Sequence, residues 1–276
     1  MMTNNTNSAI YWKQKEERAR KAIYHTEFMD RELVNETIKA ISATTFYDDS
    51  SMDLVKSLIV PNNKPNSEII VDSVSTVGAI NFLQTYDNRR KILALNFASY
   101  KVPGGGFIKG SSAQEESLCH ASNLYNILEH FDDSYYAFNR KSLNNGIYKN
   151  RALYTPNVVF SRYGDCVIGA YRKVDILTCA APNRRAQSTR VSKEDNNKAV
   201  EERCDFVCTI ADSKNVDVLI LGAWGCGVFG QNPYVVANAF KKAIRRMVCK
   251  PEKIVFAIPA SFHRENFDAF KKVFSE

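Results

Sequence analysis

Short apolar runs rich in β-branched residues alternate with longer runs of helical periodicity between Ile69 and Ile258. The expected strands are Ile69–Val71, Lys91–Phe97, Ala152–Phe160, Val174–Cys179, Val216–Leu221 and Lys253–Ile258. The expected helices run from about 76 to 86, 113 to 130, 198 to 212 and 233 to 247. Alternating strands and helices form crossover units, in which successive strands run parallel and helices cover both faces. The pattern therefore predicts a three-layer α/β/α sandwich around a mixed, largely parallel sheet.

The chain before residue 66 has a different character. Tyr11–Tyr24 and Arg31–Ile41 mix charged residues with spaced apolar ones, which is typical of surface helices. The run 61–66 is rich in proline and asparagine, as linkers often are. We therefore expect an N-terminal helical extension, residues 1–65, packed on an α/β domain of residues 66–276.

Charge and cysteine content narrow the class of protein. The 276 residues carry a formal net charge of +7, which favours anionic partners such as phosphate-rich ligands or nucleic acid. Seven cysteines, an odd number without a CxxC pair, do not form a disulfide framework and indicate a reducing compartment. The four histidines are dispersed, so we expect no metal site. No apolar run approaches the roughly 20 residues that cross a bilayer, which predicts a soluble protein without a membrane partner.

A glycine triplet, Gly104-Gly105-Gly106, follows the expected strand Lys91–Phe97 and is separated by seven residues from Gln114-Glu115-Glu116. Glycine permits dihedrals closed to other residues, so the backbone can approach a ligand closely. Open α/β sheets bind ligands at loops outside the carboxyl ends of their strands. Asn96, at the end of this strand, either offers its amide to a ligand or stabilises the turn. A glutamate pair beside such a loop predicts acid or base catalysis.

The two glutamates differ in their expected places on the helix. Ser112 and Glu115 match a capping box, with Ser112 at the N-cap and Glu115 at the third helical position. Glu116 falls beyond the box, about 100° further around the helix, and has no capping duty. Its alternative role is a surface carboxylate that complements the helix dipole. Glu116 is therefore the better candidate for proton transfer.

A second glycine loop, Gly222 to Gly230, follows the expected strand Val216–Leu221 and precedes a helix with start signals at Asn232 and Pro233. Its glycines match GxGxxG, the dinucleotide pattern of Rossmann folds. The next strand ends in Ala257-Ile258-Pro259 and lacks the acidic residue of that pattern, which disfavours a nicotinamide dehydrogenase. A diphosphate cradle at a helix N-terminus remains. Phe229 either lies along the ligand or belongs to the core.

These segments together resemble the poly(ADP-ribose) glycohydrolases of the bacterial type, whose fold is a macrodomain. The resemblance rests on GGG-x7-QEE, Leu95-Asn96-Phe97-Ala98, Ala181-Pro182-Asn183 and the loop Gly222–Gly230, and it spans Ile69 to Ile258. The resemblance implies a macrodomain-like catalytic domain that hydrolyses ribose–ribose O-glycosidic bonds and releases ADP-ribose. It implies no metal and no organic cofactor.

The resemblance also implies residue roles. Glu116 matches the catalytic acid, Glu115 the glutamate that holds the ribose, and Asn96 the asparagine at the terminal ribose. The remaining binding residues that it implies are Gly104, Gly105, Gly106, Gln114, Gly225, Cys226, Gly227, Val228 and Phe229, with the last five at the diphosphate.

Two alternatives from other classes stay open: a non-catalytic ADP-ribose reader, and a hydrolase of single ADP-ribose marks. Expected partners are poly(ADP-ribose) or ADP-ribosylated proteins, without direct nucleic-acid binding. We further expect a monomer in the cytoplasm, or in the nucleus of a eukaryote. Whether cleavage occurs at chain ends or also internally depends on loop closure, which the sequence leaves open.

Overall fold

The computed structural model describes residues 3–62, 66–86, 90–163, 166–261 and 264–275. These residues form a seven-stranded sheet in the order β1-β4-β5-β3-β6-β7-β2. The strands are β1 (Thr45–Asp48), β2 (Glu68–Asp72), β3 (Ile92–Phe97), β4 (Arg151–Tyr163), β5 (Cys166–Cys179), β6 (Val218–Leu221) and β7 (Lys253–Ala257). From β5 to β2 each neighbouring pair is parallel, whereas β4 is antiparallel to both β1 and β5. The predicted mixed, largely parallel sheet is confirmed.

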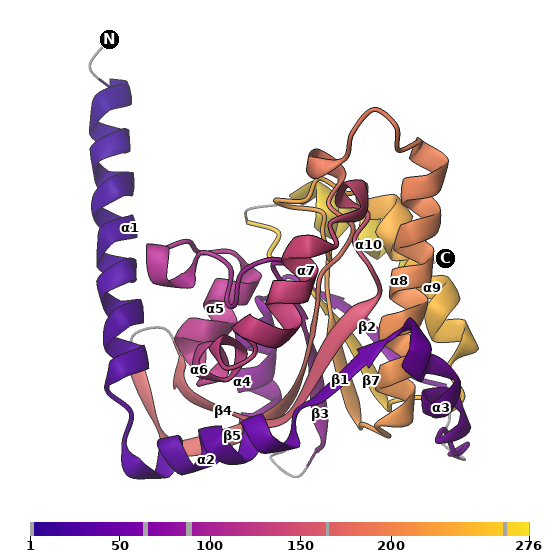
Figure 1. The fold of residues 1–276 in the computed structure, drawn as a ribbon, viewed down its shortest axis with the longest axis horizontal. Coiled ribbons are helices and arrows are strands. Elements are labelled where there is room, and N and C mark those ends of the chain that lie inside the picture. The colour runs from indigo at the N-terminus through magenta and orange to yellow at the C-terminus, as the bar shows by residue number, and fades with distance from the viewer. Residues whose placement is uncertain (1–2, 63–65, 87–89, 164–165, 262–263, 276) are drawn as a thin grey trace.

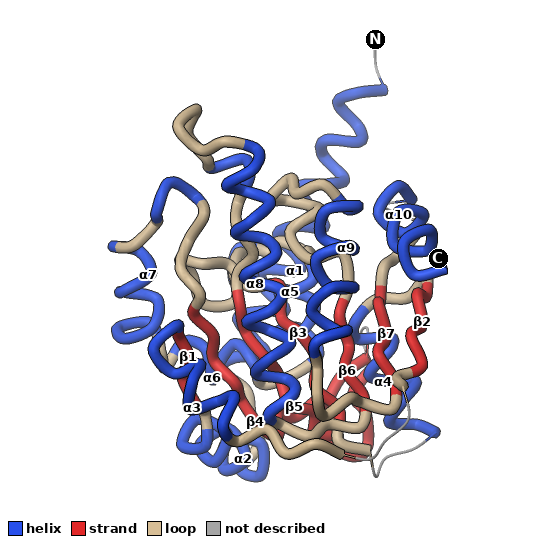
Figure 2. The backbone as a smooth tube through the Cα atoms, turned by 90° about the vertical axis from the view of Figure 1, so that its right-hand side faces the viewer, coloured by secondary structure: helices blue, strands red, loops and turns tan. Residues whose placement is uncertain are grey.

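Helices cover both faces of this sheet (Figures 1 and 2). One face is covered by α3 (Met52–Ser57), α8 (Lys193–Ser213), α9 (Pro233–Arg246) and α10 (Arg264–Ser275). The other is covered by α2 (Arg31–Ala43), α4 (Thr76–Tyr86), α5 (Gln114–Ala121) and α6 (Leu124–Glu129), and α1 (Thr3–Glu27) packs outside this layer against Phe107–Lys109. The three-layer sandwich is thus confirmed.

Alternation along the central strand β3 explains the two cores. Leu93 and Leu95 join the core with α8 and α9, while Ile92 and Ala94 join the core with α4 and α5. All four are at most 2 % exposed, because a strand with helices on both faces has no side that meets water. This buried strand fixes the position of Asn96 and of the triglycine loop after it.

The sequence suggests a purely helical N-terminal region, but the structure places a strand in it as well. Thr45–Asp48 forms the edge strand β1, which pairs antiparallel with β4 and buries Tyr47. The element is short and shows little alternation of apolar and polar residues, so its pairing with β4 decides its conformation. The predicted linker, 61–66, lies partly outside the described residues, and the boundary at residue 65 stays a prediction.

The helix expected over 113–130 is two helices, α5 and α6. The chain leaves helical geometry at Ser122, with φ −145° and ψ 179°, and forms an isolated bridge with Phe160 of β4. Asn123 holds this break, because its backbone N–H donates to Val159 O and its Oδ1 accepts from Val159 N at 2.9 Å. Pairing with β4 therefore outweighs the helical periodicity of the segment.

The segment 131–150 contains η3 (Asp132–Tyr136), α7 (Ala137–Lys141) and η4 (Asn144–Gly146) before β4 begins. Of these, η3 is a π-helix and η4 a 3-10 helix. Further 3-10 turns are η1 (Asp49–Ser51), η2 (Phe107–Lys109) and η5 (Arg184–Ala186). None of the helices in the described part of the chain is long and apolar enough to span a membrane.

Candidate active site

Three loops meet at the carboxyl edge of the sheet, after β3, β5 and β6. A Cβ added at Gly222 would lie 2.9 Å from Cζ of Phe97, and one at Gly225 would lie 2.9 Å from Cβ of Ala181. These approaches are too close for any side chain other than hydrogen, so the glycines allow the loops to contact one another. The loop after β6 therefore contacts both the loop after β5 and the end of β3, from which the chain continues into the triglycine loop.

The triglycine loop lies directly against both glutamates. Gly104 and Gly105 have φ of 62° and 60°, in the left-handed region that favours glycine. A Cβ at Gly105 would lie 2.8 Å from Oε1 of Glu116 and 3.0 Å from Oε2 of Glu115. The backbone N–H of Gly106 donates to Glu116 Oε1 at 2.8 Å. The loop thus serves as a wall for the carboxyl groups.

The predicted capping box is wrong. The N-cap of α5 is Ala113, with no side-chain hydrogen bond, so Glu115 is the second helical residue and Glu116 the third. Ser111, before the helix, instead lies against the triglycine loop: a Cβ at Gly106 would be 2.3 Å from its Oγ. Both carboxyl groups point into the protein, where the two glutamates are 3 % and 7 % exposed, so neither caps α5 nor lies at the surface.

Both oxygens of Glu115 accept hydrogen bonds from the protein. Oε1 accepts from Asn96 Nδ2 at 3.2 Å, and Oε2 accepts from the backbone N–H of Ser99 at 2.7 Å. Burial raises the pKa of Glu115 to about 8, although the N–H of Ser99 and the amide of Asn96 oppose this rise. Glu115 is therefore mostly protonated, and neutral, near pH 7.

Glu116 is held at one oxygen and open at the other. Oε1 accepts from Gly106, whereas Oε2 accepts no hydrogen bond from any described residue. Oε2 is also absent from the fully buried polar atoms that lack a partner, so this oxygen reaches solvent. The carboxyl group therefore has a fixed orientation and one accessible atom, as proton transfer to a ligand requires.

The side-chain amides of Asn96 and Gln114 have different roles in the structure. Asn96 is fully buried; its Nδ2 donates to Glu115 and Thr178, while its Oδ1 has no partner among the described residues. A turn-stabilising role for this amide is not supported. Gln114 accepts from Phe97 N at 2.8 Å and donates to Leu95 O at 2.9 Å, so it ties α5 to β3. A binding role for Gln114 stays a prediction.

The loop after β6 has unsatisfied amides. Gly227, Val228 and Phe229 donate their backbone N–H groups to no residue in the described part of the chain. A Cβ at Gly227 would meet nothing within 4 Å, and Val228 is 68 % exposed. The helix α9 follows, with Asn232 as N-cap and Pro233 at its first position, as predicted. Consecutive free amides near a helix N-terminus suit a phosphate group.

Aromatic side chains join the loops, and sequence reasoning missed two of them. Phe229 is half-buried, and its ring lies 6.3 Å from that of Tyr148, which stacks on Tyr100 at 4.0 Å. Phe229 thus contacts the core while remaining at the site. Tyr148 lies in a segment without a motif, and Tyr100 stands alone after β3, so neither carried a signal. Ser99 was missed because its contribution is a backbone N–H.

The N-terminal helix α1 also contacts the segment between the triglycine loop and α5. Arg18 Nε donates to Gly110 O at 2.8 Å, across 92 residues of sequence. A Cβ at Gly110, which has φ of 73°, would lie 1.9 Å from the carbonyl oxygen of Lys15. Sequence reasoning assigned α1 no role, because neither contact leaves a pattern in either segment. The segment between the triglycine loop and α5 is held from outside by α1.

The two cysteines near the site, Cys119 and Cys226, are free thiols in apolar surroundings. Burial raises the pKa of the Cys226 thiol to about 12 and that of Cys119 well above its usual range. The described residues include no group of three or more His, Cys, Asp or Glu side chains placed to hold a metal ion.

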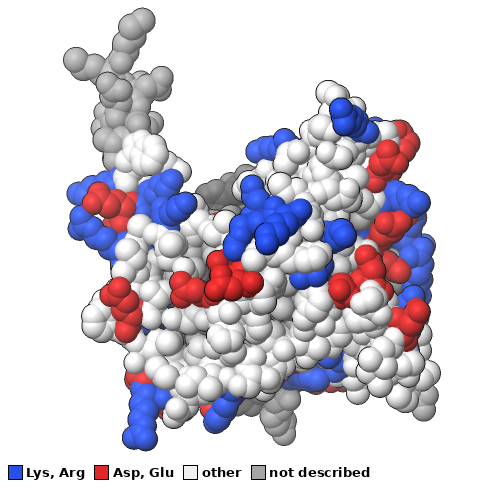
Figure 3. Space-filling model, in the orientation of Figure 1, with Lys and Arg blue, Asp and Glu red and all other residues white. Residues whose placement is uncertain are grey.

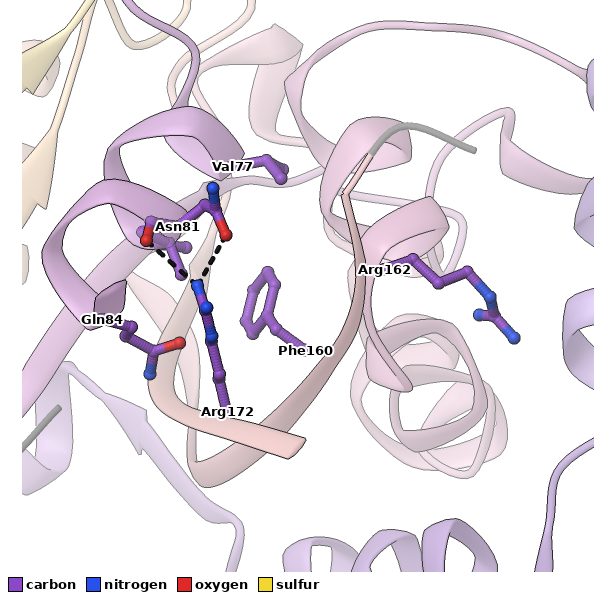
Figure 4. A pocket seen from close by; sticks show the side chains of 7 residues that line it. Val77, Asn81, Gln84, Phe160, Arg162 and Arg172 are labelled. Atoms are coloured by element: carbon purple, nitrogen blue, oxygen red, sulfur yellow. Dashed lines mark hydrogen bonds between the residues drawn. The ribbon is translucent and has the colours of Figure 1, made fainter. Parts of the chain in front are cut away.

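A small pocket lies away from these loops, between α4 and the β4–β5 hairpin (Figure 4). Arg172 there donates to the carbonyl and to Oδ1 of Asn81, with Phe160 alongside. Arg172 precedes the residues of β5 that pair with β3, so the pocket belongs to the opposite edge of the sheet. It has no part in the site described above.

The fold is that of a macrodomain-like α/β/α protein, and two buried carboxyl groups of one helix lie at the carboxyl ends of its parallel strands. The family model described as "Microbial-type PARG, catalytic domain" matches residues 13–163. The chain therefore belongs to the microbial-type poly(ADP-ribose) glycohydrolases, glycoside hydrolases that act on poly(ADP-ribose).

Solved structures agree with this assignment. Poly(ADP-ribose) glycohydrolase from Thermomonospora curvata is 26 % identical, with a TM-score of 0.84 over 94 % of this chain and 99 % of that one. The enzyme from Deinococcus radiodurans, solved in complex with ADP-ribose, is 29 % identical, with a TM-score of 0.78 over 86 % and 96 % of the two chains. Among curated proteins, no sequence matches the chain.

Proposed function

We propose that Glu116 is the general acid and base with which this chain hydrolyses ribose–ribose O-glycosidic bonds and releases ADP-ribose. The asymmetry of its carboxyl group carries the proposal: Gly106 holds Oε1, while Oε2 has no hydrogen-bond partner among the described residues and is not fully buried. Glu115, whose two oxygens both accept hydrogen bonds from the protein, is less suited to exchange protons with a ligand.

In the proposed reaction, Glu116 gives its proton to the oxygen that links the two riboses. The bond from this oxygen to the terminal ribose breaks through an oxocarbenium-like state. The Glu116 carboxylate then takes a proton from a water molecule, whose oxygen bonds to the anomeric carbon. The products are free ADP-ribose and a polymer shortened by one unit, and Glu116 is protonated again.

Glu115 and Asn96 are proposed to hold the reacting ribose. The neutral carboxyl of Glu115 can donate as well as accept a hydrogen bond, and the free Oδ1 of Asn96 can accept one from a hydroxyl. Neither residue then supplies the second charged carboxylate of common glycosidases. The diphosphate of the substrate, bound to the free amides of Gly227 to Phe229, is proposed to stabilise the positive charge instead.

The test compares Glu116→Gln with Glu115→Gln, using free poly(ADP-ribose) as substrate and released ADP-ribose as readout. Glutamine at 116 keeps an oxygen for the N–H of Gly106 but cannot deliver a proton, so kcat should fall by about 10²–10⁴-fold. Affinity for ADP-ribose should change by less than about threefold, whereas Glu115→Gln should weaken it.

Other outcomes would move the assignment. Unchanged release by Glu116→Gln would contradict the role of Glu116. Binding of the polymer by the wild type without release would favour the reader, and release from singly modified protein alone would favour the hydrolase of single marks.

A further inference from the structure

The loop between β5 and α8 carries an unusual concentration of positive charge. Within the stretch 183–192, Arg184, Arg185 and Arg190 are exposed, and no acidic residue is present. None of the three arginines forms an ion pair with a described residue. Basic side chains are visible over this loop at the top of Figure 3. We call these three residues the arginine loop.

Several basic residues on other faces of the molecule pair with carboxylates. Lys242 pairs with Glu201 at 2.6 Å, Arg246 with Asp205 at 2.8 Å, and Arg264 with Asp268 at 3.0 Å. Such pairs leave little net field for an anionic ligand. The arginine loop therefore presents a positive potential that these paired surfaces lack.

The arginine loop borders the active site directly. The backbone N–H of Arg185 donates to Phe229 O at 3.2 Å, and a Cβ at Gly230 would lie 3.0 Å from Cγ of Arg185. Phe229 is the last of the three consecutive residues with free amides, Gly227 to Phe229. The arginines thus continue outward from the wall of the site rather than occupying a separate surface.

Hydrogen bonds fix the position of this loop before any ligand binds. Asn183 N donates to Gly146 O at 2.7 Å, and Gln187 donates to Asn196 at 2.7 Å. Asn196 in turn donates to Gln231 at 2.9 Å, which joins the arginine loop to the loop after β6. These anchors fix the backbone that carries Arg184 and Arg185, which lowers the ordering cost of binding a ligand there.

We propose that the arginine loop binds the diphosphate of the next unit of poly(ADP-ribose), the one to which the terminal unit is linked. The inference rests on the proposed function. The terminal unit fills the space between the glycine loops, so the rest of the polymer lies over the neighbouring surface. Each further unit of the polymer contains a diphosphate. One guanidinium group can donate two parallel hydrogen bonds to two oxygens of a phosphate. The arginine loop borders the site and carries the positive charge that can bind this second diphosphate.

The experiment compares an Arg184→Ala/Arg185→Ala/Arg190→Ala variant with a matched control, Lys242→Ala/Arg246→Ala/Arg264→Ala, which removes the same charge from paired residues. Both are made in a Glu116→Gln background and in the wild type. In the first background, polymer binding and ADP-ribose release are measured together. Release there would contradict the proposed function, whereas the difference in binding between the two triple variants tests the arginine loop.

The triple arginine variant should bind polymers of several units about tenfold or more weakly, with affinity for ADP-ribose itself within twofold. In log–log plots of affinity against salt, its slope should be smaller by about 0.7 for each phosphate that the variant no longer binds. In the wild-type background, kcat/KM on polymer should fall while kcat stays within twofold. The control should match the parent in every measurement.

Three results would overturn the proposal. An equal decrease in affinity for ADP-ribose would assign the arginines to the terminal unit's own diphosphate. An equal decrease in affinity for the control would show that only the net charge of the protein matters, and not the position of the arginines. Competition by single-stranded RNA as strong as that by polymer of the same charge would make it a general polyanion surface.

Discussion

The two glycine loops use the same residue for opposite purposes. In the triglycine loop, Gly104, Gly105 and Gly106 each face protein atoms: Tyr125, the two glutamates and Ser111 respectively. In the loop after β6, Gly227 faces open space and its amide is free. Glycine is needed in the first loop because the interior leaves no room for a side chain. In the second it leaves room for a ligand.

This difference shows where precision is built into the site. The first loop, its glutamates and α1 form a packed unit whose geometry is set before substrate binds, and the position of Glu116 depends on it. The second loop supplies donors that need only face a diphosphate. Substitutions in the first loop should therefore damage both stability and catalysis, and those at Gly227 in the second should mainly affect binding.

Gly105→Ala should have the largest effect. The new Cβ, at φ of 60°, would meet Glu116 Oε1 at 2.8 Å and Glu115 Oε2 at 3.0 Å, so both carboxyls must shift. A displacement of this size in a catalytic group should lower kcat about 100-fold and the free energy of unfolding by about 1–3 kcal/mol. Steady-state kinetics and urea denaturation measure the two effects. Wild-type kcat in this variant would contradict a rigid first loop.

The pH dependence of stability tests whether Glu115, the buried carboxyl group against the triglycine loop, is protonated in the folded protein. Because burial raises the pKa of Glu115 from 4.5 to about 8, the folded state holds a proton that the unfolded state loses within this window. The free energy of unfolding should therefore decrease as pH rises from about 4.5 to 8, by roughly 1 kcal/mol per pH unit. Glu115→Gln should remove most of this slope. Equal slopes for the variant and the wild type would show that Glu115 is charged in the folded protein.

Arg18→Ala should have a smaller effect on catalysis, transmitted through the triglycine loop. Removal of the hydrogen bond to Gly110 O loosens the segment that leads into α5, so kcat should fall about three- to tenfold with KM nearly unchanged. Arg20→Ala is the matched control, since Arg20 lies on the same helix and is highly exposed in its pair with Glu16. A change in kcat of the same size for both variants would assign the effect to α1 as a whole.

Gly227→Ala should have the smallest effect on stability. Its φ is not in the left-handed region and nothing lies within 4 Å of the added Cβ, so the free energy of unfolding should stay within about 0.5 kcal/mol or rise slightly. Thermal unfolding without ligand checks this expectation. A decrease comparable to that of Gly105→Ala would erase the distinction between the loops.

The sequence predicted the layers, and singled out the segments that surround the candidate site, because both depend on local pattern. Strand β3 is a continuous apolar run, and the motif at Gln114 to Glu116 lies in one short segment. Contacts between distant segments left no such signal. Strand β1 forms because β4 offers an edge, α5 ends because Asn123 pairs with β4, and Glu115 turns inward because Asn96 and Ser99 receive it. The capping box failed for the same reason: tertiary contacts outweighed a valid local pattern.

The contact between Arg18 and Gly110 has a consequence for the order in which the protein is made. Ribosomes add about 5–20 residues each second, so α1 is complete roughly 5–20 s before Gly110 and the rest of its docking surface exist. During that interval α1 lacks the tertiary packing that supplies most of the stability of a helix in a protein. Its docking therefore waits for the synthesis of the segment around Gly110, and the nascent enzyme reaches its full rate only after that docking.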